Sequence, residues 1–269
     1  MNMIAFIGGG NMAAAIIGGL VKSGREAGSI SVVEPFDAQR TKLQADFGVR
    51  THAAADAALG EAATIVWAVK PQFFQAAAAP CAAHVSGALH LSVMAGIRSD
   101  AIARATGAAR VVRAMPNTPA LIGEGIAGLF ARDAVTAADR AEVEAALAPT
   151  GRTLWVAREA DLDAVTALSG SGPAYVFYFV EAMVQAAREM GLSEAQGSAL
   201  ALATFAGATS LAQASDESPA VLRERVTSKG GTTHAALASL EASGVKAAFI
   251  AALKAAQLRA RELGDEFGG

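Results

Sequence analysis

Two glycine-containing segments, one near each end of the chain, have residue types suited to binding anions. In the first, an apolar run leads directly into Gly8, Gly10 and Ala13, which match the pattern G-x-G-x-x-A before a helix-forming stretch. Gly8 permits a tight turn, Gly10 lets the backbone approach a pyrophosphate, and Ala13 allows close packing of the helix on the strand. The helix start offers unpaired N–H groups to phosphates, so the segment predicts a dinucleotide site. Its predicted cofactor residues are Gly8, Gly10, Asn11 and Met12.

The second segment, residues 226–233, has the sequence VTSKGGTT at the expected start of a helix. Exposed N–H groups there form a nest for an anion, and a small carboxylate suits it because no long basic tract lies nearby. An ordinary glycine-containing helix cap is the commoner use of such residues.

Two further loops follow expected strands. Lys70 could act as a general acid or bind a phosphate, but a lysine at a strand end is more often simply solvated. Asn117 lies between Pro116 and Pro119 in a rigid loop at a strand end, which favours a cofactor or substrate role over a structural turn. The residues of the first loop assigned to the cofactor are Ala68, Val69, Lys70 and Pro71.

Glu34 stands at the end of the second expected strand. An acidic group at this position usually binds the ribose 2′-hydroxyl of NAD and repels the 2′-phosphate of NADP. Arg40 follows closely and could partly offset that charge, so these residues leave NAD and NADP both open.

Composition narrows the class of protein. The 269 residues are 53% hydrophobic, which is enough for a sizeable core, and the net charge of −3 gives no electrostatic case for nucleic acid. The uncharged residues 1–21 could pass for a signal peptide or membrane span, but they lack a preceding basic region and are interrupted by glycines. The single Cys81 excludes an internal disulfide and fits a cytoplasmic protein. No histidine or cysteine pair has zinc spacing, so we expect no metal. No stretch of about 20 apolar residues occurs elsewhere in the chain, so we expect no membrane association.

Strand and helix patterns alternate along the first half, which predicts an α/β fold with a doubly wound parallel sheet over residues 1–157. Only helical patterns follow, so residues 158–269 form a second, all-helical domain. The expected strands are 3–7, 30–34, 64–69, 88–93, 110–114, 126–130 and 153–156. The expected helices between them are 11–23, 37–47, 72–84, 98–106 and 136–148.

The helices of the second domain are rich in alanine and apolar on more than one face, as in residues 199–212 and 247–258. Such helices would leave large apolar patches on a monomer. We therefore expect a homodimer, or a larger homo-oligomer, built through this domain.

The chain resembles the pyrroline-5-carboxylate reductases, which catalyse the last step of proline biosynthesis. The resemblance covers nearly the whole length. Its most specific motifs, in their order and spacing, are residues 167–175 and 226–233. It implies an N-terminal Rossmann domain, a helical dimerisation domain and often a ring of dimers. The motifs that carry it are residues 6–12 (FIGGGNM), 68–72 (AVKPQ), 115–119 (MPNTP), 167–175 (ALSGSGPAY) and 226–233.

The resemblance also implies NADPH as the usual hydride donor, with NADH used less well by many members. Glu34 departs from the small or neutral residues often found there, and residues 51–56 lack an asparagine that many members place near the adenosine. The substrate would be a cyclic imine that bears a carboxylate. The expected substrate residues are Gly230, Gly231, Thr232 and Thr233.

By this resemblance, the Thr233 hydroxyl would also hydrogen-bond the ring nitrogen as a catalytic group, and Ser228 would shape the loop. The site is expected between the dinucleotide crevice and helices, with those helices supplied by a partner chain. Two other classes stay open on the residues alone. One is a different imine or hydroxyacid reductase that uses Lys70 as its acid; the other is a non-catalytic dinucleotide sensor on the same fold.

Overall fold

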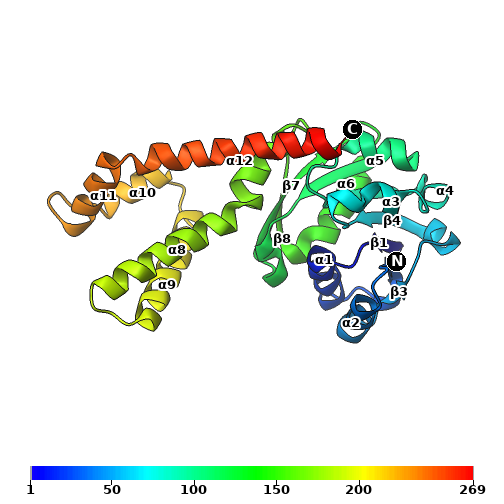
Figure 1. The fold of residues 1–269 in the computed structure, drawn as a ribbon, viewed down its shortest axis with the longest axis horizontal. Coiled ribbons are helices and arrows are strands. Elements are labelled where there is room, and N and C mark those ends of the chain that lie inside the picture. The colour runs from blue at the N-terminus through cyan, green and yellow to red at the C-terminus, as the bar shows by residue number, and fades with distance from the viewer. Residues whose placement is uncertain (1, 269) are drawn as a thin grey trace. The chain divides into compact units, whose positions relative to one another are not determined.

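The computed structural model describes residues 2–268 and divides them into two compact units. The first unit contains residues up to 171 together with the C-terminal residues from 256 onward, and the second is Gly172–Ala255. The expected boundary at residues 157 and 158 differs from this division at both ends of the helical part. Each unit is described below by itself (Figure 1).

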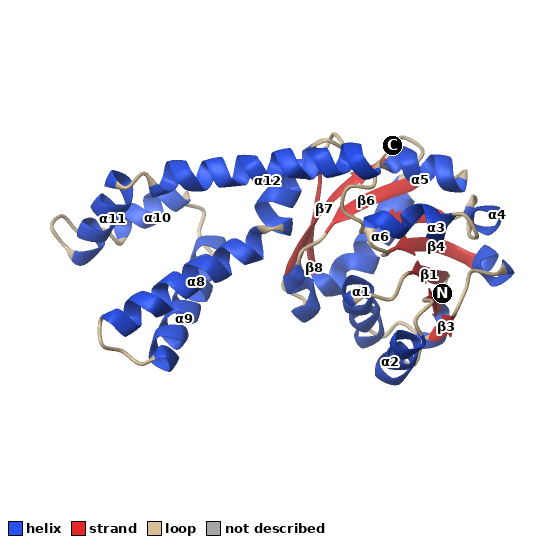
Figure 2. Ribbon diagram, in the orientation of Figure 1, coloured by secondary structure: helices blue, strands red, loops and turns tan. Residues whose placement is uncertain are grey.

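The first unit is built on one eight-stranded sheet with the strand order β3-β2-β1-β4-β5-β6-β7-β8 (Figure 2). All neighbouring strands are parallel except β6 and β7, which are antiparallel. This exception to the expected parallel sheet follows from the short connection between them, which cannot hold a helical crossover. The strands are β1 (Met3–Ile7), β2 (Ile30–Val33), β3 (Arg50–His52), β4 (Ala62–Trp67), β5 (Leu89–Ser92), β6 (Val111–Met115), β7 (Gly125–Ala131) and β8 (Gly151–Trp155).

Helices cover both faces of this sheet, as a doubly wound fold requires. Alternate side chains of β1 divide between two cores: Ile4 and Phe6 join one cluster, and Ala5 and Ile7 join the other. The helices of this unit are α1 (Asn11–Lys22), α2 (Asp37–Phe47), α3 (Phe74–Ala78), α4 (Ala82–Val85), α5 (Ser99–Thr106), α6 (Ala137–Leu147) and α7 (Asp161–Val165).

Two local expectations were wrong. The single helix expected over residues 72–84 is divided into α3 and α4, because Pro80 lacks an N–H group and restricts the residue before it. The short strand β3 was missed because its three residues show no apolar pattern. It forms only by parallel pairing of residues 50–52 with β2.

Residues 158–171 belong to the first unit because they pack on the sheet. A β-carbon at Gly128 of β7 would lie 2.6 Å from Val165 Cγ1, and one at Gly170 would lie 2.6 Å from Met115 Cε, so helix and strand are in tight contact. Between α7 and the next helix the chain makes one π-helical turn, Thr166–Gly170.

The C-terminal end of α12 (Val245–Phe267) also packs on the first unit. Arg98 forms an ion pair with Asp265, and a β-carbon at Gly96 would lie 3.1 Å from the carbonyl oxygen of Leu263. Phe267 packs against the second core cluster. These contacts explain why the last residues join the unit formed by the start of the chain.

The second unit contains α8 (Gly172–Glu189), α9 (Glu194–Gln213), α10 (Pro219–Arg225), α11 (Thr232–Ala242) and the first part of α12. Helices α8 and α9 pack closely, since a β-carbon at Gly197 would lie 2.7 Å from Ala187 Cβ. A capping box formed by Ser193 and Gln196 starts α9. Many large apolar side chains of this unit are exposed, including Tyr178 at 69% and Met190 at 75%.

No single helix within residues 2–268 has both the length and the apolar character of a membrane span. Only α11 and α12 taken together, which are bent by 56° at their junction, meet those two criteria.

One buried hydrogen-bonded pair joins β4 to β5. Trp67 Nε1–H donates to His90 Nδ1 at 2.9 Å, so His90 is neutral and its Nε2–H donates to the Val85 carbonyl oxygen at 2.9 Å. Burial lowers the pKa of His90; the hydrogen bond to Val85 opposes this effect, and the charge of Arg110 adds to it.

His90 therefore predicts a pH dependence of stability. The unfolded chain binds a proton at this imidazole more readily than the folded protein. The contribution of His90 to the free energy of unfolding is therefore complete above about pH 6.5 and is lost as the pH falls below that value. The free energy of unfolding, measured with urea between pH 7.5 and 5.5, should fall by up to about 1.4 kcal/mol per pH unit from this group. The variant H90Q should show a shallower slope, and an unchanged slope would remove His90 as the cause.

Candidate active site

The turn between β1 and α1 is locked to the ends of two neighbouring strands. Gly8 has a φ of +95°, and a β-carbon on it would lie 2.8 Å from the Ala68 carbonyl oxygen and 2.9 Å from Val69 Cγ1. Its N–H donates to the Val33 carbonyl oxygen at 2.9 Å, and the Ala68 N–H donates to the Ile7 carbonyl oxygen at 2.9 Å. Only glycine fits at this position.

The start of α1 is open to a ligand. Gly10 is the N-cap residue, makes no side-chain cap, and has no atom within 4 Å of where its β-carbon would be. The first turn, which contains Asn11 and Met12, has no acidic residue. As at any helix start, the first N–H groups have no intrahelical acceptor and carry partial positive charge. These donors and the open space beside Gly10 suit a phosphate.

Glu34 lies directly against the same turn at the carboxyl end of β2. The residue is 7% exposed, and its two carboxylate oxygens accept the N–H groups of Gly9 at 2.9 Å and Phe36 at 3.0 Å. The Gln39 side-chain amide donates to the Gly9 carbonyl oxygen. Sequence reasoning found Glu34 but missed Gln39, because its contact crosses 30 positions and no local pattern marks it.

The other sequence-predicted residues of the first unit fall at the ends of β4 and β6. Lys70 is exposed and is the N-cap residue of the short 3-10 helix Pro71–Phe73, without a side-chain cap. Asn117 Oδ1 accepts the N–H of Ile126 at 3.0 Å, so this side chain ties its own loop to β7. Ser169 Oγ, in the π-helical turn beside β6, is the one buried side-chain oxygen of the described residues without a hydrogen-bond partner.

In the second unit, residues 226–231 form the loop between α10 and α11, and Thr232 and Thr233 are the first residues of α11. Gly230 has a φ of +73°, and Gly231 is the N-cap residue of α11, with no side-chain cap. The Gly231 N–H donates to the Ser228 carbonyl oxygen at 3.0 Å, and a β-carbon at Gly231 would lie 2.6 Å from Ser228 Oγ. The loop thus brings Ser228 against the start of α11.

The first turn of α11 offers free donors. Its first intrahelical hydrogen bond runs from the Ala235 N–H to the Gly231 carbonyl oxygen at 3.1 Å, so the N–H groups of Thr232 and Thr233 precede the helical ladder. The first turn contains no acidic residue. All four predicted substrate residues, 230–233, lie in this turn and the loop before it, and the arrangement can hold a carboxylate.

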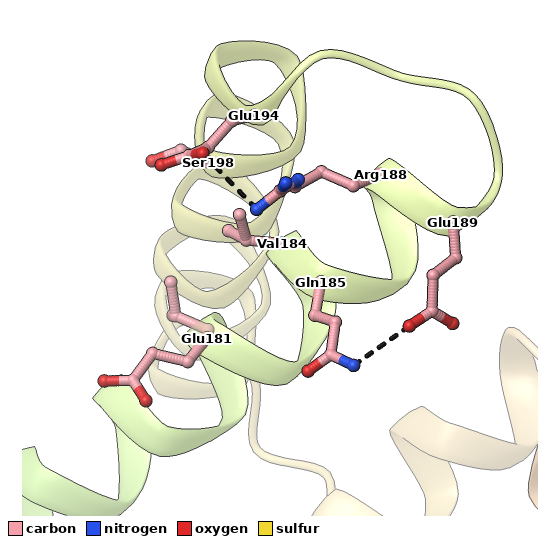
Figure 3. Close-up of a pocket in the computed structure, with 8 residues that line it drawn as sticks. Glu181, Val184, Gln185, Arg188, Glu189, Glu194 and Ser198 are labelled. Carbon is pink, nitrogen blue, oxygen red and sulfur yellow. Dashed lines mark hydrogen bonds and ion pairs between the residues drawn. The ribbon is translucent and has the colours of Figure 1, made fainter.

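A pocket of about 740 Å³ lies between α8 and α9 (Figure 3). Arg188 and Glu194 form an ion pair at 3.7 Å across its rim, and the Gln185 side-chain amide donates to Glu189 at 2.9 Å. None of the sequence-predicted site residues lines it. We therefore assign it no part in the candidate site.

Within residues 2–268, no group of three or more histidine, cysteine, aspartate or glutamate side chains is placed to hold a metal ion. Cys81 is buried, and burial raises the pKa of its thiol to about 11, so the thiolate that would act as a nucleophile is scarce at neutral pH.

Comparison with known proteins gives the same family in sequence and in structure. The model of pyrroline-5-carboxylate reductase dimerisation domains matches residues 159–263, and a model described as NADP oxidoreductase, coenzyme F420-dependent, matches residues 3–96. The pyrroline-5-carboxylate reductase of Pseudomonas aeruginosa is 42% identical over 267 residues, which cover 98% of each chain. That of Haemophilus influenzae is 40% identical and covers 97% of each.

Two solved structures are similar over almost the whole length. A pyrroline-5-carboxylate reductase from Coxiella burnetii has a TM-score of 0.91 and 36% identity, and it covers 97% of this chain and 98% of that one. A pyrroline carboxylate reductase from Plasmodium falciparum, solved with NADP bound, has a TM-score of 0.87 and 27% identity with the same coverage.

The two glycines of the first turn predict opposite effects of a single methyl group. G8A should destabilise the fold and prevent dinucleotide binding, because the methyl group meets the β4 backbone in a strained conformation. G10A has free space and should keep the thermal midpoint within about 2 °C, but should weaken dinucleotide binding at least about tenfold. Thermal unfolding and nucleotide fluorescence titration measure both effects. Unweakened binding by a folded G10A protein would contradict the assignment of this turn.

Proposed function

The chain belongs to the pyrroline-5-carboxylate reductase family, and we propose that residues 228–233 hold its substrate while the turn at Gly8 and Gly10 holds its cofactor. The protein is an oxidoreductase that reduces L-1-pyrroline-5-carboxylate to L-proline with NAD(P)H, the last step of proline biosynthesis. The observation that carries the substrate assignment is the start of α11, where glycine replaces a side-chain cap.

The residues of the first unit fit a dinucleotide. The free N–H groups at Gly10 and the open space beside it suit a pyrophosphate, and Gly8 fixes the turn that presents them. NAD(P)H, when bound, supplies the hydride. The proposed cofactor residues are Gly8, Gly10, Asn11, Met12, Glu34, Ala68, Val69, Lys70, Pro71 and Asn117.

For the substrate, we propose that the N–H groups from Gly231 to Thr233 bind the carboxylate. Charge and geometry both favour carboxylate binding there, because N–H groups at a helix start carry partial positive charge and point outward together. Gly230 permits the backbone turn with its positive φ, and Ser228 shapes the loop by its contact with Gly231.

The protein's contribution to the reaction is mainly position. A protonated cyclic imine is already an electrophile, so the site needs no strong acid, and holding reactants in a near-attack geometry can supply about 7–11 kcal/mol. We propose that the Thr233 hydroxyl hydrogen-bonds the ring nitrogen and so orients the C=N bond. A reaction that proceeds in this way needs no lysine as a general acid. Lys70 is exposed, which fits a lysine without that role.

The family's dimerisation domain matches the helical part of the chain, and the protein is an oligomer through that domain. The exposed apolar side chains of α8 and α9, such as Tyr178 and Leu211, supply the surface that a second copy would bury. We further propose a ring of such dimers. The single, buried Cys81 supports a place in the reducing cytoplasm.

The activity is tested by following the absorbance of NADH and of NADPH on addition of pyrroline-5-carboxylate to the purified protein. Substrate-dependent oxidation of either nucleotide, with formation of proline, is expected. Oxidation of neither would contradict the activity itself.

Replacement of Thr233 by alanine tests the role of its hydroxyl. T233A should lower kcat about tenfold to a hundredfold, because one hydrogen bond that orients the reacting ring is lost. T233S should restore most of the rate. The control is S239A on the same helix, which should have native kinetics. Full activity of T233A would exclude the proposed role.

A further inference from the structure

The carboxyl end of β2 brings two carboxylates and one guanidinium to the place where a dinucleotide fold binds the adenine ribose. We propose that Glu34, Asp37 and Arg40 make this protein select NADH over NADPH. The proposal rests on the cofactor site proposed above and concerns the ribose end of that site, separately from the reduction of the imine.

Arg40 is the side chain of this group that could bind a 2′-phosphate, but both of its terminal nitrogens already donate to other groups. One terminal nitrogen donates to the carbonyl oxygens of Glu34 and Pro35, each at 2.8 Å, and the other donates to the Asp37 carboxylate at 2.9 Å. The Arg40 side chain is only 19% exposed. Its charge is therefore compensated, and its planar group is held against the turn between β2 and α2.

Glu34 contributes a negative charge that no side-chain cation compensates in its hydrogen bonds. Both of its oxygens accept backbone N–H groups, those of Gly9 and Phe36. These bonds hold the carboxylate at the glycine turn, where it would be next to a ribose bound in the usual way. A hydroxyl can donate to such a group, whereas a phosphate at the same place is repelled.

The neighbouring strand adds no strong cation at this end of the sheet. His52, the last residue of β3, lies 3.6 Å from the Asp56 carboxylate. Arg50 pairs with Ser31, at the start of its strand, and its guanidinium lies near Gly28, away from the carboxyl end. Carboxylates therefore outnumber guanidinium groups at this edge, and a 2′-phosphate would bring further negative charge to it.

Helix α2 offers a matched pair of variants. Asp37 pairs with Arg40 in the first turn, and Asp46 pairs with Lys42 at 2.8 Å near the other end of the same helix. D37N removes one negative charge at the ribose end and releases Arg40 from its ion pair, whereas D46N removes the same charge far from it. Fluorescence titration gives the Kd of NADH and of NADPH for each protein without any substrate.

The native protein should bind NADH more tightly than NADPH. D37N should shift the ratio of the two Kd values toward NADPH about fivefold to tenfold, and this shift should shrink in high salt because exposed charges are screened. D46N should keep the native ratio within about twofold.

Tighter binding of NADPH by the native protein, or an equal shift in D37N and D46N, would overturn the proposal. If neither nucleotide bound, the assignment of the glycine turn would fail, and this proposal with it. Normal binding without imine reduction would contradict only the activity.

Discussion

The turn after β1 passes so close to the end of β4 that a side chain cannot fit between them. Gly8 meets this requirement with a positive φ, and its N–H and the neighbouring Ile7 carbonyl oxygen are hydrogen-bonded to β2 and β4. The ends of three strands are thereby fixed at one point, and α1 must begin there. The N-cap residue of that helix, Gly10, has open space around it and carries no capping side chain, so the first N–H groups of the helix are left free.

Three helices of this protein begin with a side-chain cap: Thr136 at α6, Ser193 at α9 and Ser218 at α10. At α1 and α11, the N-cap residues are Gly10 and Gly231, and no side chain accepts from the first turn. Leaving donors unpaired costs stability unless a ligand or water satisfies them. At both of these glycine starts an anion could satisfy the free donors, which supports the cofactor and substrate sites proposed above.

Packing brings together segments that are far apart in the chain. Glu159 accepts hydrogen bonds from the Ser99 N–H and hydroxyl and forms an ion pair with Arg113, which is 9% exposed. This network ties the residues just after β8 to β6 and to the start of α5. A buried arginine of this kind requires its carboxylate, because the unpaired charge would be costly. The first compact unit therefore extends beyond the last strand.

The sequence by itself determined the alternation of strands and helices, the two glycine-rich turns, the helical second half and the resemblance to the reductase family. Each of these features depends only on local periodicity or on a contiguous motif. The tertiary structure alone decided the antiparallel β7, the strand β3 and the return of residues 256–268 to the first unit, because these depend on partners far away in the chain. It also decided the surroundings of Glu34 and Arg40. Their residue types left the cofactor open, and only their hydrogen bonds to the glycine turn and to the β2–α2 turn define which charges remain uncompensated.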